Sequence, residues 1–280
     1  MISRRDAPQW VKEGGRTVSR TAGRLSSGLR MLPDFLLVGT QRGGTTSLFR
    51  ALAPHPGVAQ PNLHKGVHYF DMNYARGEDW YRGHFPLRRG SRLAFESAGY
   101  YMHHPLAPER IARDLPGVKL LVLLRDPVER AFSAYKHELA RGYETETSFE
   151  RALALEPGRL AGETDRIRNE PGYLSHSHRH HSYLDRGHYA EQLEVLYGLF
   201  GRERVHVAFA EDFFTEPEPC YDAMIDFLGL PPWRPATFER HNARPGSPLP
   251  ATLRTRLTEH FKPHDERLEV LLGEVPPWRR

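Results

Sequence analysis

The chain has 280 residues, of which 39% are apolar and 11% aromatic, so it can bury a full core and is short enough for one domain. Its single cysteine, Cys220, excludes an internal disulfide and a cysteine-based metal framework. No apolar run reaches the roughly 18 to 20 residues of a membrane span, and no apolar block with a cleavage site opens the chain. We therefore expect a cytoplasmic protein without a membrane span.

The formal charge of +4 is distributed unevenly. Residues 1–30 carry a net charge of +5, and the remaining residues carry −1. Because the body of the chain is not basic, its charge does not indicate nucleic-acid binding. We expect residues 1–32 to form a basic, disordered tail, with a weak contact to an anionic surface or a partner as the alternative, and residues 33–280 to form one domain.

Two strand-and-helix pairs are predicted in the first half of the chain. Residues 34–38 are typical of a buried strand, and the loop 39–47 should lead into a helix that ends before Pro54. Residues 118–124 predict a second buried strand. A helix should follow it, with Asp126 as its N-cap and Pro127 at its first position.

Later segments extend this alternation. Residues 204–209 predict a third strand, and helices are expected around 216–229 and 250–272. Strands alternating with helices imply an α/β fold, which we expect to be P-loop-like, with a central, mostly parallel sheet flanked by helices in three layers. Residues 157–182 lack periodicity and are rich in Gly, Pro, Arg and His, so we expect a mobile loop over the acceptor there.

The loop after the first strand has the features of an anion site. Adjacent glycines between a strand and a helix turn backbone N–H groups toward one point, where the helix start adds partial positive charge. A Gly-rich turn capped by Thr is the alternative. The residues expected to bind the anion are Arg42, Gly43, Gly44, Thr45, Thr46 and Ser47.

The spacing of this loop differs from that of a Walker A loop. Gly39 and Gly44 match G-x-x-x-x-G, but Thr45 stands where the lysine would follow, and the cation is Arg42 instead. No acidic residue downstream plainly supplies a magnesium ligand. The pattern favours a nucleotide donor that needs no metal, with a P-loop kinase of a small molecule or nucleotide as the alternative.

A second phosphate site is predicted at the next strand end. Arg125 follows the strand 118–124, and Ser133 lies about two helical turns further on. Because ligands of open α/β sheets lie outside the carboxyl ends of the strands, both strand ends are expected to face one nucleotide. Alternatively, Arg125 is a surface arginine beside an N-cap.

Together these residues resemble a known family, the sulfotransferases that depend on 3′-phosphoadenylyl sulfate (PAPS). Residues 41–48, QRGGTTSL, are similar to the family's 5′-phosphosulfate loop, and residues 124–135, LRDPVERAFSAY, to its 3′-phosphate motif in heparan sulfate sulfotransferases and their bacterial relatives. Further likeness lies in residues 65–71, 96–105, 186–193, 227–230 and 241–244, so it spans roughly residues 33–280. The resemblance implies PAPS as co-substrate without a metal, and adds Arg244 to the donor-binding residues.

The resemblance also implies sulfuryl transfer to a hydroxyl or amine of a glycan, a lipid or a small molecule. Three positions depart from the family pattern: Arg42 stands where Lys is usual, Gly66 where the heparan sulfate members carry a catalytic Glu, and Ser97 where they carry Lys. We therefore expect His68 to be the base, because imidazole titrates near neutral pH, with Glu96 and Asp71 as rivals.

Arg42 is expected to stabilise the leaving group. The histidine-rich segment 176–181 lacks a paired acid motif, so no metal site is predicted from it. A nucleotide-binding or glycan-binding protein without activity is the alternative from another functional class, because the usual Glu and Lys are missing.

Overall fold

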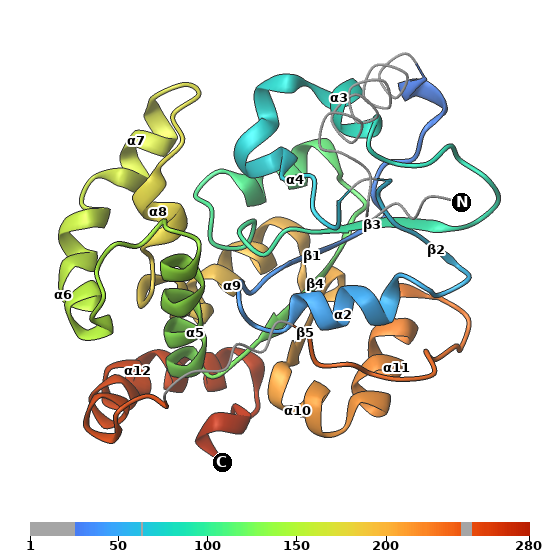
Figure 1. Cartoon of the computed structure of the whole chain (residues 1–280). Coiled ribbons are helices and arrows are strands. Elements are labelled where there is room, and N and C mark those ends of the chain that lie inside the picture. The colour runs from blue at the N-terminus through green and yellow to red at the C-terminus, as the bar shows by residue number, and fades with distance from the viewer. Residues whose placement is uncertain (1–25, 63, 242–247) are drawn as a thin grey trace, which may run out of the picture.

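Five parallel strands form one sheet at the centre of the fold (Figure 1). The computed structural model describes residues 26–62, 64–241 and 248–280. In this part of the chain the strand order is β2-β3-β1-β4-β5, and each pairing between neighbours is parallel. The α/β prediction is confirmed. The strands are β1 (Phe35–Gly39), β2 (Val58–Ala59), β3 (Leu93–Ser97), β4 (Lys119–Leu124) and β5 (Val205–Phe209).

Helices flank the sheet, and three of them gather at one side of the molecule (α6, α7 and α8 in Figure 1). The helices before this group are α2 (Thr45–Leu52), α3 (Glu78–Arg82), α4 (Ala107–Asp114) and α5 (Pro127–Ala140). The group and the helices after it are α6 (Phe149–Leu160), α7 (Glu163–Asn169), α8 (His176–His180), α9 (Tyr189–Phe200), α10 (Ala210–Thr215), α11 (Pro217–Leu228) and α12 (Ala251–Leu272).

Both faces of the sheet are covered because the side chains of β1 alternate between two cores. Phe35 and Leu37 pack with α2 and α11, whereas Leu36 and Val38 pack with α4 and α9. All four side chains are fully buried. This alternation produces the three layers expected for a central parallel sheet.

A third core packs α6 and α12 against α5. It joins α5, α6 and α12, with Tyr135, Phe149 and Phe261 among its buried side chains. The start of α5 is as predicted, since the Asp126 carboxylate accepts a hydrogen bond from the Val128 N–H at 2.9 Å. One face of α5 packs in this core, and the helix begins just after the end of β4.

The expected loop at 157–182 is wrong, because most of this segment is helical. Two serines start the helices: Ser148 accepts from the Arg151 N–H at the start of α6, and Ser175 accepts from the His178 N–H at the start of α8. Buried contacts then hold the segment, notably through Ile167. The two N-cap serines could have predicted these helix starts, but the polar composition of the segment suggested a loop.

The described residues 26–32 of the predicted tail pack against the domain. Met31 is buried, and its N–H donates to the Pro86 carbonyl at 3.1 Å. The rest of the tail prediction lies outside the described residues.

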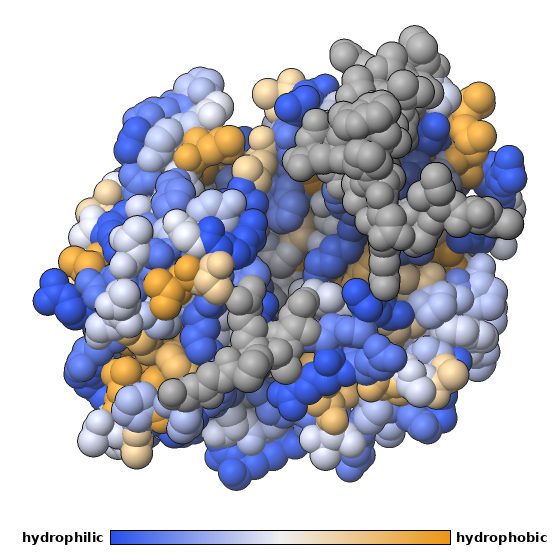
Figure 2. Space-filling model, viewed as in Figure 1, coloured by the Kyte–Doolittle hydropathy of each residue, from blue (hydrophilic) through white to orange (hydrophobic). Residues whose placement is uncertain are grey.

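No helix of the described chain is both long and apolar enough to cross a bilayer. On the face shown in Figure 2, hydrophilic side chains predominate and apolar ones form small, scattered patches.

Candidate active site

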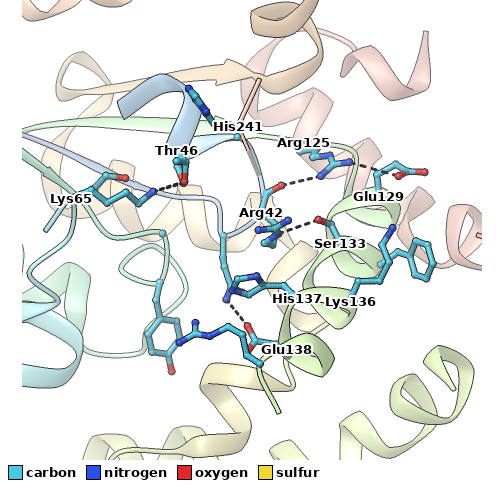
Figure 3. Close-up of a pocket in the computed structure, with 18 of the residues that line it drawn as sticks. Arg42, Thr46, Lys65, Arg125, Glu129, Ser133, Lys136, His137, Glu138 and His241 are labelled. Carbon is cyan, nitrogen blue, oxygen red and sulfur yellow. Dashed lines mark hydrogen bonds and ion pairs between the residues drawn. The ribbon is translucent and has the colours of Figure 1, made fainter. Parts of the chain in front are cut away.

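A cavity of about 450 Å³ opens at the carboxyl edge of the sheet. It is lined by the loop after β1, by residues at the ends of β3 and β4, and by side chains of α5 and α8 (Figure 3). The central strand β1 lies between β3 and β4, so the chain changes direction across the sheet at this point. Ligands of open α/β sheets bind at such topological switch points.

The loop after β1 places the start of α2 at this cavity. Gly44 has a φ of 94°, which favours glycine, and Thr45 and Thr46 form the first helical turn. Gly44 and both threonines line the cavity. The N–H groups of a first helical turn have no partner within the helix and carry partial positive charge, so this end of the cavity suits an anion.

Two residues of the predicted loop set lie behind the cavity lining. A Cβ on Gly43 would lie 2.6 Å from the Leu123 carbonyl oxygen, so only glycine lets the loop approach β4 this closely. The Ser47 hydroxyl accepts a hydrogen bond from the His241 N–H at 2.8 Å. Gly43 and Ser47 therefore shape the loop and hold residue 241, which does line the cavity.

The two motifs that the sequence placed on separate strand ends meet in this cavity. The Arg42 Nε donates to the Ser133 hydroxyl at 3.0 Å, and the Arg125 guanidinium donates to the Arg42 carbonyl at 3.1 Å (Figure 3). Arg125 also lies 3.7 Å from the Glu129 carboxylate. Two guanidinium groups and a hydroxyl thus meet in this cavity, from the loop after β1, the residue after β4 and α5.

Lys65 is a cation of this cavity that the sequence reasoning did not select. Its ammonium group donates to the hydroxyls of Thr46 at 3.0 Å and Thr45 at 3.4 Å. Burial, with the nearby Arg42 charge, lowers the pKa of Lys65 to about 8. The signal that could have identified Lys65 is its place in segment 65–71, which resembles the family. This segment brings a lysine to the loop after β1, where Arg42 replaces the family's usual lysine.

His68 lines the cavity near this lysine, and its ring is oriented by Asp71. The His68 Nδ1 lies 2.8 Å from the Asp71 carboxylate, which is buried. Burial of the imidazole lowers its pKa, but the Asp71 charge and hydrogen bond, together with Glu96, outweigh this, so the pKa of His68 is raised. The pair leaves the other ring nitrogen for a ligand.

Arg42 and His68 share an unusual backbone conformation. With φ values of 70° and 55°, they are the only non-glycine residues with positive φ in the described part of the chain. Such conformations cost free energy and persist only where the surrounding structure imposes them, which occurs often at active sites.

Glu96 is fully buried beneath His68 and does not line the cavity. Its carboxylate accepts hydrogen bonds from the Val67 N–H at 2.5 Å and from the hydroxyls of Tyr81 at 2.6 Å and Tyr101 at 2.9 Å. Burial raises the pKa of Glu96. Its contacts fix the backbone that carries His68.

Gly66 has no room for the side chain that the family pattern would place there. A Cβ at this position would lie 2.4 Å from the Ser97 carbonyl oxygen. The backbone at 65–67 therefore lies against the end of β3, so a glutamate at this position would require the backbone to move.

Another wall of the cavity comes from α5 and α8, and it contacts the loop after β1. The Glu138 carboxylate accepts from the Gln41 amide at 3.1 Å and pairs with His180 at 2.9 Å, while His178 pairs with the Tyr100 hydroxyl at 2.7 Å. Arg244 lies outside the described residues. Among the residues described, the cations that line the cavity are Arg42, Lys65, Arg125, Lys136, Arg141, Arg179 and Arg240.

The sequence and the fold have known relatives. The sulfotransferase domain family matches residues 32–242. A sulfotransferase structure from Alicyclobacillus acidocaldarius is 31% identical, with a TM-score of 0.70, over 89% of this chain and 100% of the other.

Curated proteins match more distantly. The membrane-associated sulfotransferase kil1 of Dictyostelium discoideum is 25% identical over 96% of this chain and 71% of its own length. The human bifunctional heparan sulfate N-deacetylase/N-sulfotransferase 3 is 27% identical over 89% of this chain but only 31% of its own length. Because the family match covers more than half of the chain, the chain belongs to the sulfotransferase family, as an enzyme that uses PAPS as its sulfuryl donor.

Proposed function

We propose that this cavity binds PAPS and transfers its sulfuryl group to a hydroxyl or amine of an acceptor. The 5′-phosphosulfate would lie on the start of α2 with Arg42, and the 3′-phosphate would lie on Arg125 and Ser133. The observation that carries this proposal is that these residues meet in one cavity, where the Arg42 side chain donates to the Ser133 hydroxyl and the Arg125 side chain donates to the Arg42 carbonyl. Arg244, which the resemblance also implies, stays a prediction.

Each step of the proposed reaction has a group in place. The acceptor oxygen or nitrogen forms a bond to sulfur as the bond between sulfur and the bridging oxygen breaks, and adenosine 3′,5′-bisphosphate (PAP) leaves. The free ring nitrogen of His68 takes the acceptor proton, and Asp71 holds the ring and stabilises the imidazolium that forms. Arg42, joined by Lys65, stabilises the negative charge that develops on the leaving nucleotide.

The position of Glu96 supports a positioning role for this residue, although it was a rival for the base. Its carboxylate is enclosed by three donors and has no access to the cavity. Asp71 contacts the ring of His68 instead of the cavity, so its geometry also favours a supporting role.

We favour an anionic glycan as acceptor over a lipid or a neutral small molecule. Lys136 of α5, Arg141 just after α5 and Arg179 of α8 line the same cavity and attract negative charge. Several relatives are named for heparan sulfate. The absence of the family's Glu at Gly66 and of its Lys at Ser97 argues against assigning heparan sulfate itself, so a panel of sulfated and carboxylated glycans should be tested with radiolabelled PAPS.

A thermal-shift comparison tests the proposed donor against a kinase. Only a ligand that prefers the folded state raises the melting temperature. We expect PAP to raise it, and ATP with magnesium to leave it nearly unchanged. Stabilisation by ATP with magnesium alone would favour the kinase, and binding of PAP without transfer to any acceptor would favour an inactive binding protein. The cytoplasmic location expected from the sequence stays a prediction.

A further inference from the structure

A cluster of three histidines joins α9 to α12, outside the lining of the donor cavity. His188 precedes the first turn of α9, while His260 and His264 lie one turn apart on α12. One nitrogen from each imidazole lies within 4.8 Å of the others. Imidazole nitrogens in this number are typical ligands of transition-metal ions.

A shared ion requires the rings to turn, because the planes of His188 and His264 lie only 10° apart and the lone pair of an imidazole nitrogen lies in the plane of its ring. His188 and His264 stack with their centroids 3.8 Å apart, and His260 lies 5.8 Å from each of them. Tetrahedral coordination at the usual Zn–N distance requires nitrogens about 3.4 Å apart, so the rings must move closer by about 1 Å. His260 is exposed and His264 partly exposed, so their side chains can rotate to do so.

The two ring nitrogens of His188 have different surroundings. Its Nδ1 faces the Asp185 carboxylate at 3.8 Å, whereas its buried Nε2 has no hydrogen-bond partner. A carboxylate beside one ring nitrogen orients the other toward a metal in many metal sites. Burying an imidazole nitrogen without a partner is costly, so an ion at this position would satisfy it.

We propose that His188, His260 and His264 bind one divalent transition-metal ion of the Zn²⁺ type, with water completing the coordination. The ion would hold α12 against the start of α9, where Arg267 already pairs with Glu191. Arg186 lies two residues before His188, and its guanidinium donates to the Gln41 side chain in the donor loop. The site is separate from sulfuryl transfer, and its test does not depend on that activity.

Calorimetric titration of the untagged protein with Zn²⁺ tests the site, with the absorption spectrum of bound Co²⁺ as a second readout. We expect one ion per chain, and visible Co²⁺ bands of the strength that tetrahedral coordination produces. His260→Ala and His264→Ala should each weaken binding at least about tenfold, since each removes one of three ligands. His260 is exposed, so its variant should fold normally.

His176→Ala is the matched control, because it removes a histidine from the dense segment 176–181 without touching the cluster. It should leave Zn²⁺ affinity unchanged. The proposal is overturned if the wild-type protein binds no Zn²⁺, if neither α12 variant weakens binding, or if His176→Ala weakens it equally. A loss of binding in His103→Ala alone would also overturn it, by assigning the ion to His103, His178 and Asp185.

Discussion

The two ends of the cavity are built in different ways. At the donor end, the loop after β1 and the start of α5 present backbone N–H groups and the side chains of Arg42 and Arg125, all close to a strand end. At the other end, His68 stands on a buried network in which Glu96 of β3 holds the preceding residue and Asp71 orients the ring. The proposed donor end joins two strand-loop-helix units with local motifs, whereas the proposed base depends on a buried carboxylate of another strand.

The largest expected effect comes from removing the proposed base. His68→Ala should lower the rate of sulfuryl transfer by about 10²- to 10⁴-fold, the usual contribution of a general base, while the affinity for PAP stays nearly unchanged. Transfer of radiolabelled sulfate and calorimetric titration with PAP measure the two quantities. His176→Ala, outside the cavity, is the control. Near wild-type transfer in the His68 variant would mean that another residue is the base. The end of the cavity around His68 would then not be the catalytic end.

The next effect concerns the missing glutamate. Gly66→Ala should destabilise the fold by about 1–3 kcal/mol, because its Cβ would press on the Ser97 carbonyl. For the same reason, adding Gly66→Glu to His68→Ala should not restore transfer. Gly117→Ala is the control, since a Cβ there has no neighbour within 4 Å. Rescue by Gly66→Glu would show that the backbone near His68 can accommodate the catalytic glutamate found at this position in the heparan sulfate members.

Lys65 links the two ends and gives a pH-dependent prediction. The pKa of its ammonium group is lowered to about 8, so the free protein loses this charge as the pH rises through that value. PAP affinity should therefore fall by about tenfold between neutral and alkaline pH, the loss of one charge-assisted hydrogen bond. Lys65→Arg, which stays charged, should flatten this dependence, and Lys136→Arg should not. An unchanged slope in Lys65→Arg would remove Lys65 from donor binding.

The smallest effect is expected from Asp71→Asn. The Asp71 carboxylate is the main influence that raises the pKa of His68, and the base works only when it is neutral. Losing that charge lowers the pKa, so the acidic limb of the activity profile should move to lower pH. A pH profile of transfer measures this shift. An acidic limb that stays in place would mean that His68 is not the titrating group.

The contrast between the two ends also explains what the sequence could predict. β1 and β4 were predicted because each contains a continuous apolar run, and β5 because only His206 interrupts one. The Asp126-Pro127 pair marks the start of α5 by local chemistry alone. β3 was missed because Glu96 interrupts its apolar pattern, and only three donors from elsewhere make that carboxylate compatible with a core position.

The residues proposed to bind the donor were likewise easier to select than those proposed to support the base. Arg42, Arg125 and Ser133 belong to motifs with fixed spacing, and the structure brings all three together. Lys65 and the role of Glu96 depend on how the segment 65–71 packs against β3, which no local pattern encodes. The helices within 157–182 were missed because buried contacts, and not periodicity, hold them.

The convergence of the two phosphate motifs is tested most directly by calorimetric titration of the wild type and Arg125→Ala with PAP and with adenosine 5′-monophosphate, which lacks the 3′-phosphate. The wild type should prefer PAP. Arg125→Ala should weaken PAP binding by about ten- to a hundredfold, the value of a charge-assisted phosphate contact, and leave the affinity for the monophosphate nearly unchanged. Equal weakening of both nucleotides, or a preference for PAP that survives in the variant, would contradict a 3′-phosphate site at Arg125.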